Sequence, residues 1–204
     1  MQILKPKFEI LTPQSRIDDI NKMIEVVGRT CYRSEDRITD DSATRFVKML
    51  KNKGHWAMLE HEVISVRLTV DRGVTHEVVR HRHTAYGQES TRYVNYNKKG
   101  MGFIDPEPHF KKSISISIWL AAMKRAEYYY NRLINLGESP EMARTVLPNS
   151  LASQLVVTTN LTEWLHIFRL RTSSAAHPQM REVMIPLQGE FQRLLPEIFG
   201  PPGQ

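Results

Sequence analysis

Arginine, histidine and hydroxyl side chains are concentrated in one short stretch of the chain, between Arg80 and Arg92. The stretch opens with Arg80-His81-Arg82-His83 and closes with Gln88-Glu89-Ser90-Thr91-Arg92. Arginine presents five N–H donors in a rigid plane, and they fit phosphate and planar carbonyl groups in pairs. An isolated Arg-x-Arg pair is more often a solvated basic loop. The second cluster favours a different interpretation, a site that binds an anion carrying a flat ring.

Three further segments hold residues that could take part in chemistry. They are Gly54 to His61, Ala143 to Pro148, and Asn160 to His177, the last of which includes His166, Arg169 and Arg171. A metal site is an alternative, because five histidines lie between positions 55 and 83. Zinc sites combine histidine with cysteine or carboxylates at regular spacing, whereas here two arginines flank His81 and would repel a cation. We therefore expect no metal.

Two other functions are weaker alternatives. Ser90 does not lie in the Gly-x-Ser-x-Gly turn of a hydrolase, so we interpret it as a phosphate ligand rather than a nucleophile. Cys31 falls on a predicted helix, where a small core residue is expected. The net charge of +6 and the pI near 9.5 suit an anionic ligand. Basic residues alternate with acidic ones, however, and no helix carries the one-sided Lys/Arg stripe of a duplex-binding protein.

Size and composition indicate one globular domain over residues 1–204, with 41% hydrophobic and 25% charged residues. A single cysteine excludes an internal disulfide and fits a reducing compartment. The N-terminal residues lack the apolar segment of a secretory signal, and the apolar stretch at 116–123 is far shorter than the ~20 residues that span a bilayer. We expect a soluble, cytoplasmic protein.

The elements that must position these residues follow from periodicity and capping signals. Alternating or β-branched residues predict strands at 8–11, 62–70 and 151–159. Helical spacing predicts helices at 15–31 with Ser15 as N-cap, 41–53, 113–136, from Ser139 to before Pro148, from Thr162, and 179–199 with a kink at Pro186. Residues 74–80 fit a helical turn, and 95–108 fit a loop. The predicted fold class is α/β (α+β), one domain whose central, mostly antiparallel sheet is flanked by helices.

Arg80-His81-Arg82, seven residues and then Ser90 resemble the Arg-His-Arg-x7-Ser signature of the flavin-dependent (alternative) thymidylate synthases. The resemblance extends over residues 28–185, with His55 and Glu60 before a strand, Arg144 before Val-Leu-Pro, Asn160 heading a helix, and Arg171. It implies conversion of dUMP to dTMP, with FAD as cofactor. It also implies 5,10-methylenetetrahydrofolate as carbon donor, NADPH as reductant, and a homotetramer whose active sites are shared between subunits.

The resemblance also implies roles for individual residues. Those expected to bind dUMP are Glu77, Val78, Val79, Arg80, Gln88, Glu89, Ser90, Thr91, Arg92, Arg144 and Arg171. Those expected to bind FAD are His55, Ala57, Arg80, His81, Arg82, Gln88, Asn160, Leu161, Thr162 and His166. Ser90 and Arg92 would hold the phosphate. Arg171 would be catalytic, because a cation facing the uracil ring stabilises its developing negative charge. Cationic neighbours should keep His81 neutral.

The chain departs from the family pattern at several positions. Ala85 and Ala57 stand where many members have serine and threonine, and Glu77 replaces an amide, which would be unfavourable near a phosphate unless Glu77 pairs with Arg80. The spacing between Arg171 and His177 is two residues longer than in some members, which puts the role of His177 in doubt. Two alternatives stay open: a flavoprotein acting on another nucleotide, and a nucleotide-binding protein without catalysis.

Overall fold

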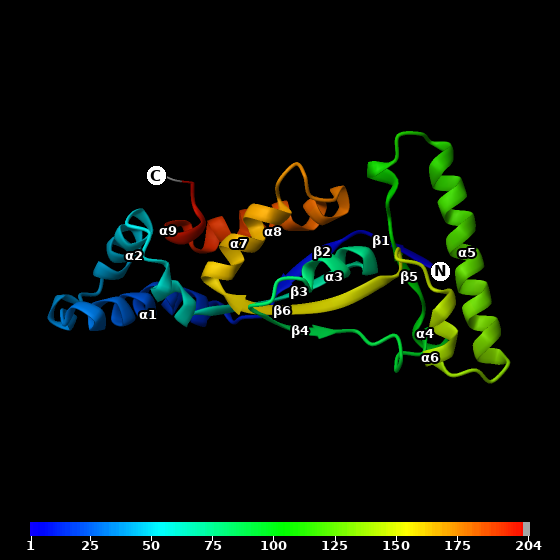
Figure 1. The fold of residues 1–204 in the computed structure, drawn as a ribbon, viewed down its shortest axis with the longest axis horizontal. Helices are drawn as coiled ribbons and strands as arrows, with labels where there is room; N and C mark the ends of the chain where they lie inside the picture. Colours follow the sequence, from blue (N-terminus) through cyan, green and yellow to red (C-terminus); the bar gives the residue numbers. More distant parts are fainter. Residues whose placement is uncertain (202–204) are drawn as a thin grey trace.

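A four-stranded antiparallel sheet runs through the middle of the computed structural model, which describes residues 1–201 (Figure 1). Its strand order is β2 (Lys7–Ile10), β3 (Val63–Asp71), β6 (Ala152–Asn160) and β4 (Thr84–Gln88). The long central pair runs in register from Val63 opposite Asn160 to Asp71 opposite Ala152. The predicted fold class and the three predicted strands are confirmed. Strand β4 was not predicted, because its pattern is short and it is a strand only through pairing with β6.

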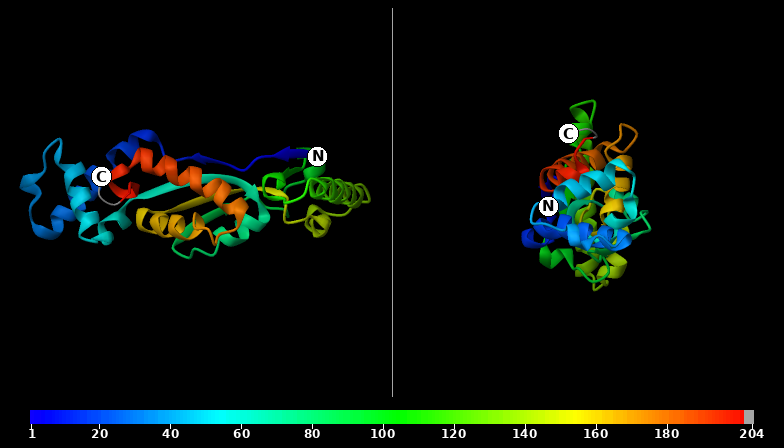
Figure 2. Two further views of the ribbon diagram at one scale, coloured as in Figure 1. Left: turned by 90° about the horizontal axis from the view of Figure 1, so that it is seen from above. Right: turned by 90° about the vertical axis from the view of Figure 1, so that its left-hand side faces the viewer.

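One face of this sheet is buried under helices, and the other is polar. Ile64, Val66 and Leu68 of β3 are fully buried with Leu155 and Val157 of β6. Helices α7 (Leu161–Arg171) and α8 (Pro178–Leu194) supply the other side of this core, and both lie over the same face of the sheet (Figures 1 and 2). The two-residue alternation predicted for β3 therefore decides which face of the sheet packs against the helices.

Helices α1 (Gln14–Tyr32) and α2 (Ser42–Asn52) form one end of the elongated molecule (Figure 1), joined by a short 3-10 helix, η1 (Glu35–Arg37). Two expectations about α1 were wrong. Pro13 rather than Ser15 precedes its first residue, because the fixed φ of proline already suits a helix start. Cys31 is exposed and not part of the core, because it falls on the outward side of the last turn.

The C-terminal segment also differs from the predicted single helix. Helix α8 ends at Leu194, and a separate turn, α9 (Pro196–Phe199), follows. The break lies at Pro196, which has no N–H to continue the helical hydrogen bonds and disfavours helical backbone in the residue before it. Pro186 lies inside α8.

The other end of the molecule has a smaller core of its own (Figure 1). The segment predicted as loop, 95–108, holds α4 (Tyr96–Lys99), β5 (Gly102–Ile104) and η3 (Glu107–His109), and β5 pairs in parallel with β1 (Gln2–Leu4). These short elements lack periodicity, so only their pairing and burial could reveal them. The long helix expected near 113–136 is confirmed as α5 (Ile114–Asn135), followed by α6 (Pro140–Ala143) and η4 (Arg144–Val146).

Only a narrow side of α5 packs against the rest of the chain. Ile118 is 66% exposed and Tyr129 54% exposed, whereas Met123 and Tyr130 are buried. The chain offers α5 only the small core around Tyr96 and Phe103, which covers a narrow strip of the helix. A broad apolar surface is therefore left uncovered on this helix. In the part of the chain that the structure describes, no helix is long and apolar enough to cross a membrane. A single domain over residues 1–204 stays a prediction.

Candidate active site

The Arg-His-Arg segment begins at the end of a short capped helix, α3 (Arg72–Val78). Asp71 ends β3 and caps α3, because its Oδ1 accepts a hydrogen bond from the Val74 backbone N–H at 2.8 Å. Tyr86 on β4 places its hydroxyl 2.7 Å from the carbonyl oxygen of Val78 and 2.8 Å from that of His81. The turn after α3 is thus fixed to the sheet, with Arg80 exposed and Val78 in the core. Any ligand contact by Val78 must be made by its backbone.

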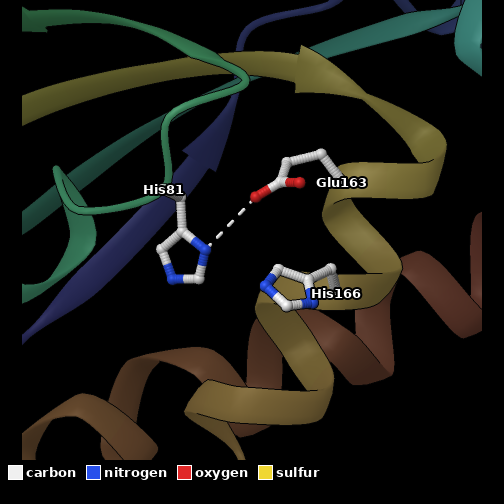
Figure 3. Close-up of side chains that lie close together, drawn as sticks. All are labelled: His81, Glu163 and His166. Carbon is white, nitrogen blue, oxygen red and sulfur yellow. Dashed lines mark hydrogen bonds and ion pairs between the residues drawn. The ribbon is translucent and has the colours of Figure 1, made fainter.

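Helix α7 brings the second half of the site to the same place. Asn160 is its N-cap, and its Oδ1 accepts from the backbone N–H of Glu163 at 2.8 Å. The Glu163 side chain reaches back to His81, with 3.2 Å between Oε1 and Nδ1 (Figure 3). His166, one turn further along α7, lies with its ring edge-to-face against His81 at a centroid distance of 5.6 Å.

Arg171 at the end of α7 completes the network and sets the proton on His81. Its Nε donates to His81 Nε2 at 3.0 Å. An arginine nitrogen can only donate, so Nε2 is the acceptor and the ring proton sits on Nδ1, facing Glu163. Burial lowers the pKa of His81 and the charge of Arg171 lowers it further, against the opposing effect of Glu163. The predicted neutral state is supported, although burial, which was not foreseen, is the larger cause.

Glu77, on the last turn of α3, holds the same guanidinium from the other side. Arg171 Nη1 donates to Glu77 Oε2 at 3.0 Å, and Nη2 donates to the Glu77 backbone carbonyl at 2.8 Å. The carboxylate that replaces the family's amide therefore has an ionic partner. That partner is Arg171, not Arg80 as expected.

His81, Glu163 and His166 have the composition of a metal site, and their ligand atoms lie within 4.8 Å of one another (Figure 3). Both nitrogens of His81 are already hydrogen-bonded, however, one of them to a guanidinium. A divalent cation would have to displace Arg171 and then lie beside its positive charge. This chemistry favours a hydrogen-bonded network over a metal centre, and the absence of a metal stays a prediction.

Three adjoining cavities surround this network. One of about 730 Å³ is lined by His76, Glu77, Val79, Arg80, Arg82 and Arg171. A second of about 310 Å³ shares Arg80, Arg82 and Arg171 with it and adds His81, His83, Glu163, His166 and Leu170. A third of about 390 Å³ shares His166 with the second and is otherwise lined by Trp56, Thr162, Leu165 and Arg169. Because they share lining residues, the three cavities adjoin one another, and together they are called the groove; it is strongly basic around the arginines and partly apolar around Trp56 and Leu165.

With the exception of Gln88, the residues expected to bind FAD line this groove or lie one or two positions along the chain from residues that line it, and their chemistry fits that cofactor. The first turn of α7 offers backbone N–H groups and a positive dipole end for phosphate, next to Arg80 and Arg82. The Leu161 side chain is fully buried, so only its backbone is available. His55 and Ala57 belong to the segment around η2 (Trp56–His61), which the Thr162 hydroxyl ties to α7 through the Trp56 carbonyl at 3.1 Å.

The expected phosphate-binding residues lie elsewhere, beyond the far end of β4. Strand β4 rises about 3.3 Å per residue, so its length puts roughly 15 Å between the Arg-His-Arg turn and Ser90. Arg144 Nη1 donates to Thr91 Oγ1 at 3.1 Å, and Arg92 Nη2 donates to the Tyr93 hydroxyl at 2.8 Å. None of Gln88, Glu89, Ser90, Thr91, Arg92 and Arg144 lines the groove. One chain does not bring the two halves of the signature together.

Gln88 and Glu89 at the end of β4 are held by contacts within the chain. Gln88 Nε2 donates to the Thr75 hydroxyl at 2.9 Å, and Glu89 Oε1 accepts from the Tyr96 hydroxyl at 2.8 Å. Unlike Glu77, two other positions at which the chain departs from the family pattern lie outside the network: Ala85 is exposed on β4, and His177 is exposed in front of α8.

Sequence reasoning missed Glu163 as a site residue. Its one sequence signal is its position three residues after Asn160, which is typical of a carboxylate that favours a helix N-terminus. That signal predicts a helix start and carries no information about His81, which is far away in sequence. Trp56, in the wall of the groove, was not predicted as a site residue either.

Comparison with known proteins agrees with this site. The family model described as "Thymidylate synthase complementing protein" matches residues 15–197. The flavin-dependent thymidylate synthase of Corynebacterium glutamicum is 29% identical, covering 90% of this chain and 80% of its own length. That of Corynebacterium efficiens is 30% identical, with 87% and 78% covered.

A solved structure shares the fold. It is the UMP/dUMP methylase PolB from Streptomyces cacaoi bound with 5-Br dUMP, which superposes with a TM-score of 0.78 at 20% identity, over 98% of this chain and 95% of that one. The family match covers the Arg-His-Arg signature, α7 and the groove between them. The chain therefore belongs to the flavin-dependent thymidylate synthase family, which confirms the predicted family and class of enzyme.

Proposed function

We propose that this chain catalyses the reductive methylation of dUMP to dTMP, with FAD as cofactor, 5,10-methylenetetrahydrofolate as carbon donor and NADPH as reductant. The observation that carries the proposal is the fixed guanidinium of Arg171, which lies where the basic cavity adjoins the cavity at the start of α7. The family match supports the same assignment. We propose that the reaction takes place in the cytoplasm, on the basis of the single cysteine.

Arg171 would act on the pyrimidine ring. Three of its five N–H donors are used by Glu77 and His81, which leaves two for a ligand in the basic cavity. A guanidinium held in place stabilises negative charge as it develops on the ring, without having to reorganise during the reaction. The ring carbon that takes up the new methyl group becomes more nucleophilic as a result.

FAD would occupy the groove between the Arg-His-Arg turn and the first turn of α7. When bound, it supplies the hydride that reduces the transferred carbon. The protein's part would be to hold and orient FAD: Arg80 and Arg82 would bind its phosphates, and Trp56 with Leu165 would offer an apolar wall. Neutral His81, its proton directed to Glu163, adds no further cation beside Arg171.

A second copy of the chain would complete the nucleotide site. Ser90, Arg92 and Arg144 are suited to a phosphate, yet β4 keeps them away from Arg171 of their own chain. Assembly into a homotetramer with shared active sites resolves this separation. The exposed apolar residues of α5, among them Ile118 and Tyr129, give such an assembly a surface to bury.

Tritium release from dUMP labelled at C5 tests the proposal, with methylenetetrahydrofolate, FAD and NADPH supplied. We expect release by the wild type and none by Arg171→Ala, which should still fold and bind FAD. Arg193→Ala is the matched control, because Arg193 also pairs with a glutamate but on the exposed side of α8. Full turnover by Arg171→Ala would show that its role is misassigned.

FAD binding and a change of nucleotide substrate separate the competing functions. A protein that is colourless and does not bind added FAD would contradict the catalytic proposal and favour a nucleotide-binding protein without catalysis. UMP offered in place of dUMP tests for a different nucleotide, which is pertinent because the solved relative PolB is described as a UMP/dUMP methylase. Methylation of UMP alone would overturn dUMP as the substrate.

A further inference from the structure

The guanidinium of Arg171 is held by two different elements of the chain. Glu77, at the end of α3, receives Nη1 on its carboxylate and Nη2 on its carbonyl oxygen, while His81 receives Nε. Arg171 itself is the last residue of α7. Its planar group therefore bridges α3, the turn that follows it, and α7, and its orientation depends on all three.

Of the three hydrogen bonds that Arg171 donates, only the one to the Glu77 carboxylate joins two charged groups. Charge-assisted hydrogen bonds are about twice as strong as neutral ones, and arginine otherwise retains many rotamers. The Arg171 side chain is largely buried and the Glu77 side chain about 40% exposed, so the pair is partly shielded from water. Without the Glu77 carboxylate, the guanidinium would lack its counter-ion and would keep only its bonds to the Glu77 backbone carbonyl and to His81, so an anion in the basic cavity could compete for it.

We propose that Glu77 is a positioning residue, which directs the two unused N–H donors of Arg171 towards the pyrimidine and keeps them from the substrate phosphate. This inference rests on the proposed function. This role explains why the Glu77 carboxylate lies beside an anion-binding cavity. Arg171 neutralises the carboxylate, and the carboxylate in turn restrains the direction in which Arg171 donates its hydrogen bonds. The Glu77 carboxylate should therefore affect the turnover rate rather than the affinity for the nucleotide.

The test compares Glu77→Ala with Glu77→Gln in steady-state kinetics and in direct dUMP binding by calorimetry. We expect Glu77→Ala to lower kcat about tenfold while the Kd for dUMP stays the same or decreases, because an unpaired cation still attracts phosphate. Glutamine retains an oxygen acceptor at the same place and should restore most of the turnover. Glu9→Ala is the control, because it removes an ion pair of similar length, to Arg67, between two strands.

The outcomes separate this inference from the proposed function. If the wild type releases no tritium from dUMP, the proposed function fails, and a crystal structure of Glu77→Ala still decides the positioning role. A guanidinium displaced from His81 Nε2 in that structure supports the role, and one left in place overturns it. If the wild type is active, a Glu77→Ala variant with unchanged kcat, or one with lower affinity for dUMP, overturns it as well.

Discussion

Asn160 joins the start of α7 to the groove, and two substitutions separate its structural from its binding role. Its Oδ1 accepts from the Glu163 backbone N–H at 2.8 Å, with the extended backbone of an N-cap (φ −73°, ψ 166°). Since Oδ1 is occupied by the cap, a hydrogen bond to FAD has to come from Nδ2. Alanine removes both functions, whereas aspartate keeps the acceptor and removes the donor.

The expected magnitudes follow from those two roles. Asn160→Ala should lower the free energy of unfolding of the FAD-free protein by about 1 kcal/mol, the usual cost of an N-cap. Asn160→Asp should be as stable as the wild type, because aspartate caps equally well. Losing a hydrogen bond to a charged phosphate costs about 1.5–3 kcal/mol, so both variants should bind FAD roughly 10- to 100-fold more weakly.

The measurements are urea unfolding of the FAD-free protein at fixed concentration and titration of FAD by fluorescence. Ser139→Ala serves as the comparison, because Ser139 caps the four-residue helix α6, away from the groove. It should lose some stability and keep its affinity for FAD. Wild-type affinity for FAD in Asn160→Asp would refute a donor role for Nδ2, and wild-type stability in Asn160→Ala would refute the cap.

Three further predictions concern stability alone. Gly28→Ala should destabilise the protein by about 1 kcal/mol, because the new Cβ would lie 2.5 Å from a ring carbon of Phe46 and overpacking outweighs the gain in helix propensity. Gly189→Ala, with open space around the Cβ, should stabilise it by about 1 kcal/mol in the same urea titration. Glu62→Gln should also stabilise it, on the order of 1 kcal/mol at pH 7, because the buried Oε2 of Glu62 has no hydrogen-bond partner, Arg16 is 4.0 Å away, and burial raises the pKa of Glu62. A raised carboxyl pKa means that stability is lost as pH rises above 4.5, so the gain should shrink towards pH 4, and a constant gain would contradict this reasoning.

Much of the architecture follows from local rules and was predictable. The alternating apolar residues of β3, the existence of the long helix α5 and the Ser139-Pro140 helix start are borne out. The elements that were missed, β4 and β5 among them, are short and lack a periodic apolar pattern. Their strand conformation comes from partners far away in sequence, so no local signal could have revealed them.

The sequence by itself determined the family and the kind of ligand, because the Arg-His-Arg segment and Ser90 have side chains whose donors fit a phosphorylated ring compound whatever their arrangement. Only the tertiary structure decided which groups meet. It paired Glu77 with Arg171, fixed the His81 proton on Nδ1 through Arg171, and left Ser90 and Arg144 outside the lining of the groove. The physical reason is that hydrogen bonds and ion pairs act over a few ångströms in space, and distance in space is set by how α3, β4 and α7 pack, not by distance along the chain.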